Sequence, residues 1–252
     1  MSGRETFRSL ESPRSRLVFP LDVPDAKSAL ALARALGGRV GFLKVGLELF
    51  VARGPGLLAD LRAAAPESGI FLDLKLHDIP ATVGRAMEAA ARLGVDLATV
   101  HAQGGPAMMR EAAERSGAAV VLGVTVLTSL DPADLNELSP ENRSPGAYAA
   151  LLAGRALAAG CGGLVCSSLE TKNLRALGGP GPLLVTPGVR PAWSQVGGDD
   201  QKRVGTVGDA LKTGADLLVV GRPIRDAPSP AEAADRVLGE IESALAEIKN
   251  QG

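Results

Sequence analysis

Residues 70–101 read IFLDLKLHDIPATVGRAMEAAARLGVDLATVH and contain two candidate strands with a candidate helix between them. The runs at 70–76 and 97–101 are short and almost continuously apolar, as strands buried on both faces of a parallel sheet are. The segment VGRAMEAAARLG at 83–94 is rich in alanine and leucine and predicts the helix that crosses between them. The stretch therefore predicts one strand–helix–strand unit.

The same alternation recurs along the whole chain. Six further apolar runs predict strands at 17–23, 40–46, 119–127, 162–168, 182–188 and 216–222, and other helices are predicted at 25–36, 147–160 and 231–248. Eight alternations fit an α/β fold in which one closed (β/α)8 TIM barrel spans residues 17–252. An open doubly wound sheet usually has fewer strands and a glycine fingerprint in its first turn.

Motifs, net charge and cysteine content argue against several classes of function. The chain has no G-x-G-x-x-G after a strand and no G-x-x-x-x-G-K-[ST], which disfavours dinucleotide and P-loop nucleotide binding. With 27 Lys and Arg against 28 Asp and Glu, the net charge of -1 predicts no nucleic-acid partner. Two cysteines, Cys161 and Cys166, build neither a disulfide framework nor a four-ligand zinc site.

The sequence also predicts a location. Residues 1–16 carry four Arg without an apolar stretch, so we expect a flexible N-terminal arm rather than a secretory signal. No uncharged apolar run reaches the length that spans a bilayer, and we expect no membrane association. A reducing, cytoplasmic location fits the low cysteine content.

Barrel enzymes carry their sites at the carboxyl ends of the strands, so polar residues there are candidates. Two of only seven lysines, Lys44 and Lys75, lie inside apolar strands, where an ammonium needs a partner. Asp73 and Lys75 are two residues apart and share one side of a strand, and Lys44 on the neighbouring strand completes a Lys–Asp–Lys cluster. A structural ion pair is the alternative. Because several charges converge on one rim, we favour a functional site.

The loops after the last two predicted strands indicate a phosphate site. The segments VTPGVRP (185–191) and VVGRPI (219–224) lie where barrels often bind phosphate through backbone N–H groups and a basic side chain. Arg222 is the expected phosphate partner, and Gly221 permits close approach of the backbone. Ordinary turn chemistry is the alternative for each motif taken alone.

Metal binding is not expected at this rim. Asp22, Asp73 and Asp78 offer oxygen ligands for Mg²⁺, but the two nearby lysines oppose a divalent cation. His77 and His101 lack a metal-binding spacing and are interpreted as structural.

The stretch FLDLKLHDIPATV at 71–83 resembles the D-x-K-x-x-D-I-P-x-T signature of the orotidine 5'-phosphate decarboxylase family. Further similar segments follow in the family's order, and the resemblance covers residues 16–245. They are LDVPD (21–25), FLKVGLELF (42–50), TVHAQGG (99–105), VTVLTS (124–129), TPGVRP (186–191), DDQKRV (199–204) and VVGRPI (219–224).

The resemblance implies a role for each matching residue. Asp22 and Lys44 would bind the ribose hydroxyls, and Asp73 and Lys75 would face the carboxylate and C6 of the pyrimidine, with Lys75 as proton donor. The resemblance also implies a homodimer in which Asp78, Ile79 and Thr82 reach the partner's site, Asp78 as a catalytic group. The remaining substrate contacts would be Thr128 and Ser129 at the base, and Arg190, Gln201, Gly221 and Arg222 at the phosphate.

The implied activity is conversion of orotidine 5'-phosphate to UMP and CO₂ in de novo pyrimidine biosynthesis, without metal or cofactor. Two alternatives stay open: a Mg²⁺-dependent sugar-phosphate decarboxylase or aldolase of the same superfamily, and a barrel that binds a nucleotide without catalysis. Lys44 argues against the first, because those relatives tend to have a metal-binding carboxylate there. The complete charged cluster argues against the second.

Overall fold

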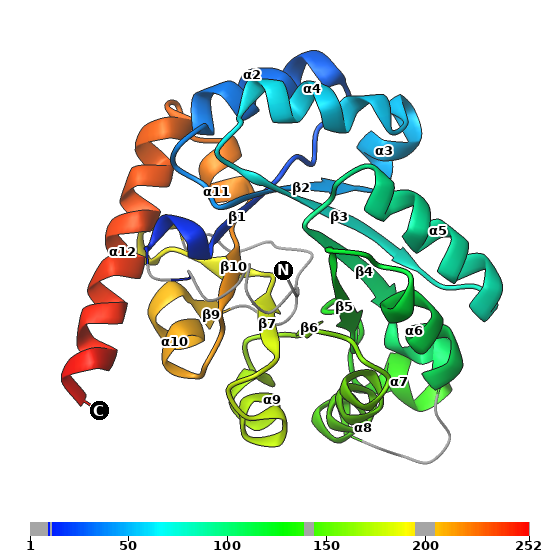
Figure 1. Ribbon diagram of the computed structural model, residues 1–252. Helices are drawn as coiled ribbons and strands as arrows, with labels where there is room; N and C mark the ends of the chain where they lie inside the picture. The colour runs from blue at the N-terminus through cyan, green and yellow to red at the C-terminus, as the bar shows by residue number, and fades with distance from the viewer. Residues whose placement is uncertain (1–9, 11, 139–143, 195–204, 252) are drawn as a thin grey trace.

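The computed structural model describes residues 10, 12–138, 144–194 and 205–251, and its centre is a closed barrel of eight parallel strands (Figure 1). The eight predicted strands are all present, and the predicted barrel is confirmed. The order around the barrel is β1-β10-β7-β6-β5-β4-β3-β2. The strands are β1 (Leu17–Pro20), β2 (Phe42–Gly46), β3 (Gly69–Leu76), β4 (Leu97–His101), β5 (Val120–Val124), β6 (Gly163–Val165), β7 (Leu183–Thr186) and β10 (Leu217–Val219).

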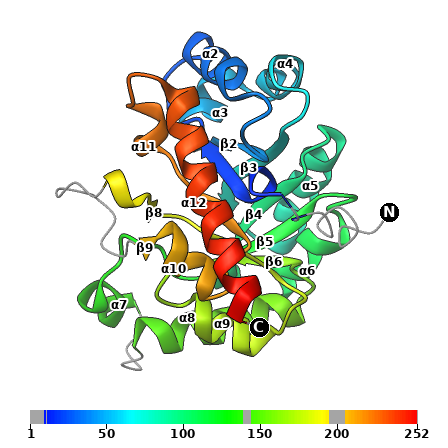
Figure 2. The ribbon, with the colours of Figure 1, turned by 90° about the vertical axis from the view of Figure 1, so that its left-hand side faces the viewer.

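Helices surround the barrel, and the long C-terminal helix runs along its outside (Figure 2). The helices are α2 (Ala26–Leu36), α3 (Leu47–Arg53), α4 (Gly56–Ala64), α5 (Pro80–Arg92), α6 (Gly105–Glu114), α7 (Pro132–Leu138), α8 (Pro145–Ala158), α9 (Thr171–Gly178), α10 (Val207–Lys212), α11 (Arg222–Arg225) and α12 (Pro230–Gln251). Short 3₁₀ turns are η1 (Arg14–Arg16), η2 (Ala102–Gly104) and η3 (Ala192–Ser194), and β8 (Val189–Arg190) pairs with β9 (Gly205–Thr206) in a separate small sheet.

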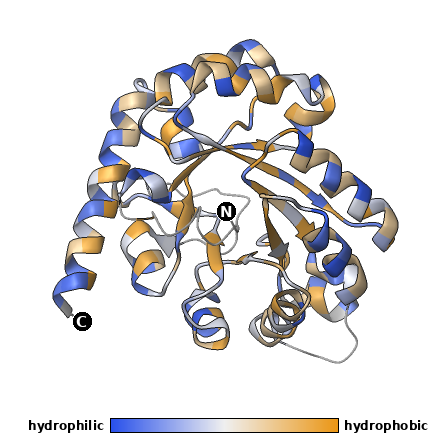
Figure 3. Cartoon of the chain, viewed as in Figure 1, coloured by the Kyte–Doolittle hydropathy of each residue, from blue (hydrophilic) through white to orange (hydrophobic). Residues whose placement is uncertain are grey.

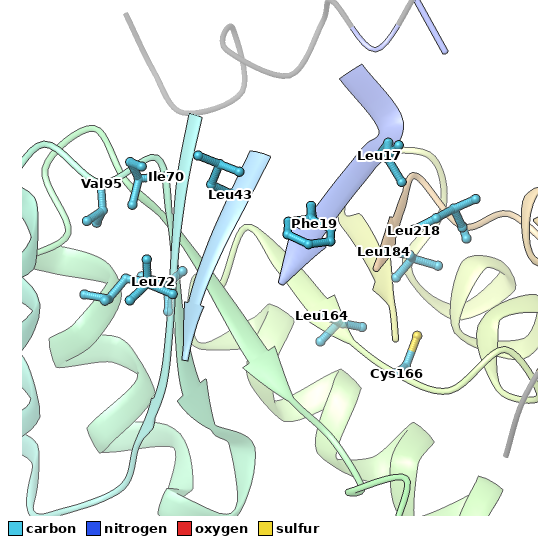
Figure 4. Packing of buried hydrophobic residues seen from close by; sticks show 14 of the residues in the cluster. Leu17, Phe19, Leu43, Ile70, Leu72, Val95, Leu164, Cys166, Leu184 and Leu218 are labelled. Carbon is cyan, nitrogen blue, oxygen red and sulfur yellow. The ribbon is translucent and has the colours of Figure 1, made fainter. Parts of the chain in front are cut away.

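Two apolar cores hold the fold together. The larger core lies between the strands and the surrounding helices, and Figure 4 shows strand residues of this core, such as Phe19 and Leu43. The smaller core is formed by alternate strand residues, among them Val18 and Phe71, and fills the barrel interior. Both faces of the strands are therefore apolar, and the barrel strands are mostly in the hydrophobic colour in Figure 3. This explains the almost unbroken hydrophobicity of the strand sequences.

Helix boundaries differ from the sequence expectation where proline begins a helix. Helix α5 was expected from residue 83 but begins at Pro80, the first helical position, where proline's fixed φ suits the helix and its missing N–H is not needed. Helix α8 likewise begins at Pro145, and the side chain of Ser144 accepts a hydrogen bond from the Ala147 N–H. Both prolines lie just before the apolar pattern that predicted the helices.

The end of the predicted N-terminal arm belongs to the barrel. Residues Arg14–Arg16 form η1, Arg14 Nη1 lies 2.9 Å from Glu67 Oε2, and Arg16 donates to the carbonyl of Asp216. The last residues of the expected arm therefore contact the barrel, and its flexibility stays a prediction. Among the described residues, no helix has both the length and the apolar character needed to cross a membrane.

Candidate active site

A pocket of about 540 Å³ opens at the carboxyl ends of the barrel strands. Its floor is apolar and includes Phe71, Val185 and Val219 from the barrel interior. Charged and polar side chains from several strands surround it, which matches the expected position of a barrel active site. They are Asp22, Lys44, Asp73, Lys75, Thr128, Arg190, Arg222 and Arg225.

The predicted Lys–Asp–Lys cluster forms one wall of this pocket. Asp73 Oδ2 lies 2.9 Å from Lys75 Nζ and 3.3 Å from Lys44 Nζ, and Lys44 Nζ lies 3.3 Å from Asp22 Oδ1. The sequence prediction that these charges lie together is confirmed. Four charged groups thus alternate in sign along the rim of β1, β2 and β3.

Burial and charge act in opposite directions on the Asp73 carboxyl. Its burial disfavours the charged form and by itself would raise the pKa. The ammonium groups of Lys44 and Lys75, and hydrogen bonds from Lys75 and Thr99, outweigh that effect and hold the pKa below its ordinary value. Asp73 is therefore a buried, ionised carboxylate that faces the pocket.

Lys75 reaches Asp73 through an irregular strand and not through the regular alternation that the sequence suggested. Leu72 pairs with Ala98 and Leu76 with Val100, so four steps along β3 match only two along β4. Within this bulge Lys75 has a φ of 51°, the only positive value among the described non-glycine residues. Such a backbone costs roughly 1–2 kcal/mol for a residue other than glycine. Bulges of this kind re-aim side chains beside active sites.

The other end of the pocket is built by the loops after β7 and β10. Arg190 lies on β8, which the short β8–β9 pairing holds beside the barrel, and Arg222 opens α11. Gly221 precedes it, and a Cβ there would lie 2.8 Å from Pro20 Cγ. Glycine is therefore required for the close approach of the β10 loop to β1. Its predicted role, close approach of the backbone to a phosphate, stays a prediction.

The remaining predicted site residues fall into three groups. Thr128 lines the pocket, whereas its neighbour Ser129 is exposed and outside the lining. Asp78, Ile79 and Thr82 lie beyond β3 and do not line the pocket of their own chain. Gln201 lies outside the described residues.

Comparison with known proteins places this site in a family. Residues 15–237 match the model of the orotidine 5'-phosphate decarboxylase / HUMPS family. The chain belongs to this family. A protein named orotidine 5'-phosphate decarboxylase from Anaeromyxobacter sp. (strain K) is 52% identical over 224 residues, which cover 88% of this chain and 96% of that protein. The resemblance inferred from the sequence is confirmed.

Two further family members agree with this result over nearly the full length. The orotidine 5'-phosphate decarboxylase of Desulfosudis oleivorans is 45% identical over 97% of this chain and 100% of its own length. The crystal structure of the enzyme of that name from Lactobacillus acidophilus superposes with a TM-score of 0.78 at 33% identity, covering 89% of this chain and 98% of that one. The barrel and its order of strands are therefore those of the family.

Two further residues of the site were not predicted from the sequence. Thr99 on β4 accepts a hydrogen bond from the Lys75 N–H at 2.9 Å and donates one to Asp73 Oδ1 at 3.0 Å. Arg225 lines the pocket and donates to the backbone carbonyl of Asp22 at 3.0 Å. The available signals were a threonine inside the apolar run LATVH and a second arginine three residues after Arg222.

The rings of His77 and His101 stack on each other. The ring centroids of His77 and His101 are 5.5 Å apart, and burial, with the nearby charges of His77 and Lys75, lowers the pKa of His101. Across the described part of the chain, no three His, Cys, Asp or Glu side chains gather as a metal site would require.

Proposed function

We propose that this chain is an orotidine 5'-phosphate decarboxylase that produces UMP and CO₂ in de novo pyrimidine biosynthesis. The observation that carries this proposal is the Lys44–Asp73–Lys75 cluster at the wall of the pocket, in a chain of this family. The substrate is inferred from the names of the relatives. The cluster contains the charged groups that decarboxylation of this substrate requires.

Lys75 performs the central step. When the bond between C6 and the carboxylate breaks, CO₂ leaves and the electron pair remains on C6 of the pyrimidine. The Lys75 ammonium stabilises this developing negative charge and then donates a proton to C6, which forms the C–H bond of UMP. Water returns a proton to the lysine. The ring carries no electron sink of its own for this pair, so the stabilisation comes from the protein.

Asp73 holds the Lys75 ammonium in place. Its carboxylate lies 2.9 Å from Lys75 Nζ and faces the side of the pocket where the substrate carboxylate would lie. The ammonium donates a charge-assisted hydrogen bond to this carboxylate, which holds its position. The same negative charge beside the substrate's departing carboxylate favours loss of that group.

The rest of the pocket binds the nucleotide away from C6. Asp22 and Lys44 bind the ribose hydroxyls, Thr128 and Ser129 contact the base, and Arg190, Gln201, Gly221 and Arg222 surround the phosphate. Binding energy from these remote groups orients the ring and supports the chemical step. The distribution of charge supports this assignment, because Arg190 and Arg222 line the pocket from the loops after β7 and β10, which are not neighbours of β3 in the barrel.

The cluster favours chemistry without a metal over a Mg²⁺-dependent reaction on a sugar phosphate. Lys44 Nζ lies 3.3 Å from an oxygen of Asp22 and 3.3 Å from an oxygen of Asp73. An ammonium therefore occupies the position between the two carboxylates that a divalent cation would need. A non-catalytic barrel would not require a lysine with a strained backbone paired with a buried aspartate. The Lys75–Asp73 pair therefore disfavours this third alternative.

The active form is a cytoplasmic homodimer whose sites lie at the interface. Apolar side chains after β2 and β3 support this: Leu47, Val51 and Ile79 are 55%, 79% and 65% exposed. Large apolar side chains that form one contiguous exposed surface mark an interaction site, and these three follow neighbouring strands. Asp78 precedes Ile79 and lies outside its own chain's pocket, which supports the assignment of Asp78 and Thr82 to the partner's site.

Turnover of orotidine 5'-phosphate by the purified chain in excess EDTA tests this function. We expect the ultraviolet absorbance of the substrate to fall and UMP to form at an undiminished rate in the chelator. Absence of turnover, or turnover that appears only when Mg²⁺ is added, would overturn the proposal. A parallel reaction with a 3-keto sugar phosphate and Mg²⁺ shows whether the alternative substrate class is used instead.

A further inference from the structure

Thr99 stands out as a fully buried hydroxyl directly behind the reacting groups. It lies on β4 and is 1% exposed, so it has no contact with solvent and does not line the pocket. Its Oγ1 accepts the hydrogen bond of the Lys75 N–H at 2.9 Å and donates to Asp73 Oδ1 at 3.0 Å. One hydroxyl thus contacts both members of the lysine–aspartate pair.

The irregularity of β3 explains why a side chain is needed at this point. In a regular parallel ladder each backbone N–H of β3 would donate to a carbonyl of one of its two neighbouring strands, β2 or β4. The ladder is broken between Leu72 and Leu76, and Thr99 lies on β4 between their two pairing partners. Its hydroxyl accepts from the Lys75 N–H at a site where a buried donor would otherwise be left without a partner.

The second hydrogen bond fixes the carboxylate. Asp73 offers Oδ2 to the two lysines and Oδ1 to Thr99, so both of its oxygens are engaged. A carboxylate held at both oxygens cannot rotate about its last torsion without losing one set of contacts. Its orientation relative to the Lys75 ammonium is then set before any substrate binds.

We infer that Thr99 is a positioning residue for decarboxylation, through its hydroxyl and not through its volume. The hydroxyl stabilises the left-handed backbone at Lys75 and also the orientation of the Asp73 carboxylate. The position of the proton donor relative to this carboxylate is therefore fixed. This inference rests on the proposed function, because it concerns the same two reacting groups.

Three variants separate the hydroxyl from packing. Thr99→Val keeps the shape and removes both hydrogen bonds, Thr99→Ser keeps the hydroxyl, and Thr125→Val serves as the matched control. Thr125 is also fully buried at the end of the next strand, but its hydroxyl donates to the Val165 carbonyl and contacts neither reacting group.

We expect Thr99→Val to lower kcat by about 10- to 100-fold, as loss of hydrogen bonds to charged groups does. KM should change by less than about threefold, because the groups that bind the nucleotide are untouched. Thr99→Ser should recover most of the wild-type kcat, and Thr125→Val should leave kcat unchanged. If Thr99→Ser is as slow as Thr99→Val, or if Thr125→Val is equally slow, packing is the cause and the inference is overturned.

A crystal structure of Thr99→Val gives a readout that does not depend on activity. We expect the positive φ at Lys75 to be lost and the contact between Lys75 Nζ and Asp73 to lengthen. An unchanged Lys75 backbone and an unchanged Asp73 carboxylate would overturn the inference. Failure of the wild-type chain to act on orotidine 5'-phosphate would overturn the proposed function, while this structural result would still decide the role of Thr99.

Discussion

Asp73 is the residue on which the site's electrostatics depend. A buried ionic group is stabilised only when its partners and hydrogen bonds compensate for lost hydration. Asp73, 8% exposed, has two ammonium groups and one hydroxyl as partners. The sequence alone predicted the two lysines, because charged residues inside apolar strands need partners. It could not predict Thr99, since a threonine in a strand is equally compatible with ordinary packing.

Substitution of this residue tests the balance of charges. We expect Asp73→Asn to lower the free energy of unfolding by about 3–5 kcal/mol at neutral pH, because two ammonium groups lose their buried partner. Asp22→Asn, whose side chain is 56% exposed, should cost less than about 1 kcal/mol. Urea unfolding at one fixed protein concentration measures both.

The lowered pKa of Asp73 also predicts how the difference in unfolding free energy between wild type and Asp73→Asn depends on pH. Such a group contributes its full stability above the unfolded pKa of 3.8, and the contribution is lost as the pH falls through the lower folded value. The gap between wild type and Asp73→Asn should therefore stay constant from pH 8 to pH 5 and narrow only below pH 3.8. A gap that closes between pH 7 and pH 5 would show that the pKa of Asp73 is not lowered.

At the scale of elements, the strands were predictable and their irregularities were not. Apolar runs identify buried parallel strands because both faces contact other elements. The bulge in β3 has no glycine to signal it, and the sequence assigned Lys75 to a regular strand. The two-residue strands β8 and β9 are too short for any periodicity to indicate. Both irregular features carry site residues, Lys75 and Arg190.

Two glycines test the packing of these elements with opposite expected signs. A Cβ at Gly163 in β6 would lie against the Leu183 carbonyl and 2.7 Å from Leu122 Cδ2, so Gly163→Ala should destabilise the barrel by about 3 kcal/mol or more. A Cβ at Gly154 in α8 meets nothing within 4 Å, and Gly154→Ala should stabilise the fold by about 0.5–1 kcal/mol. Thermal unfolding of both variants decides the matter: equal shifts in one direction would contradict this account of β6.

For the whole molecule, closure of the barrel places distant residues together. Asp22 near one end of the sequence and Arg222 near the other line one pocket, because β1 and β10 are neighbours in the closed sheet. The rhythm of strands and helices predicted this closure. It could not show where Asp78 acts, because in the proposed shared site that depends on a second copy of the chain.

Subunit exchange tests whether the site is shared. Lys75→Ala and Asp78→Ala homodimers should each be poorly active. In a heterodimer one site collects both defects, and the other combines a native Lys75 with a native Asp78. An equal mixture should therefore recover about one quarter of wild-type activity, since half of the dimers are mixed and each has one complete site. If tagged pull-down shows heterodimers and activity does not return, Asp78 acts within its own chain.

The most direct measurement for the whole account is the decarboxylation of orotidine 5'-phosphate in D₂O by wild type, Lys75→Ala and Lys172→Ala. Lys172 is an exposed lysine on α9 and controls for loss of an ammonium elsewhere. The account predicts that wild type and Lys172→Ala form UMP with one deuterium at C6, and that folded Lys75→Ala forms no detectable product. Near-normal turnover by Lys75→Ala would contradict the account, because Lys75 could then not be the proton donor.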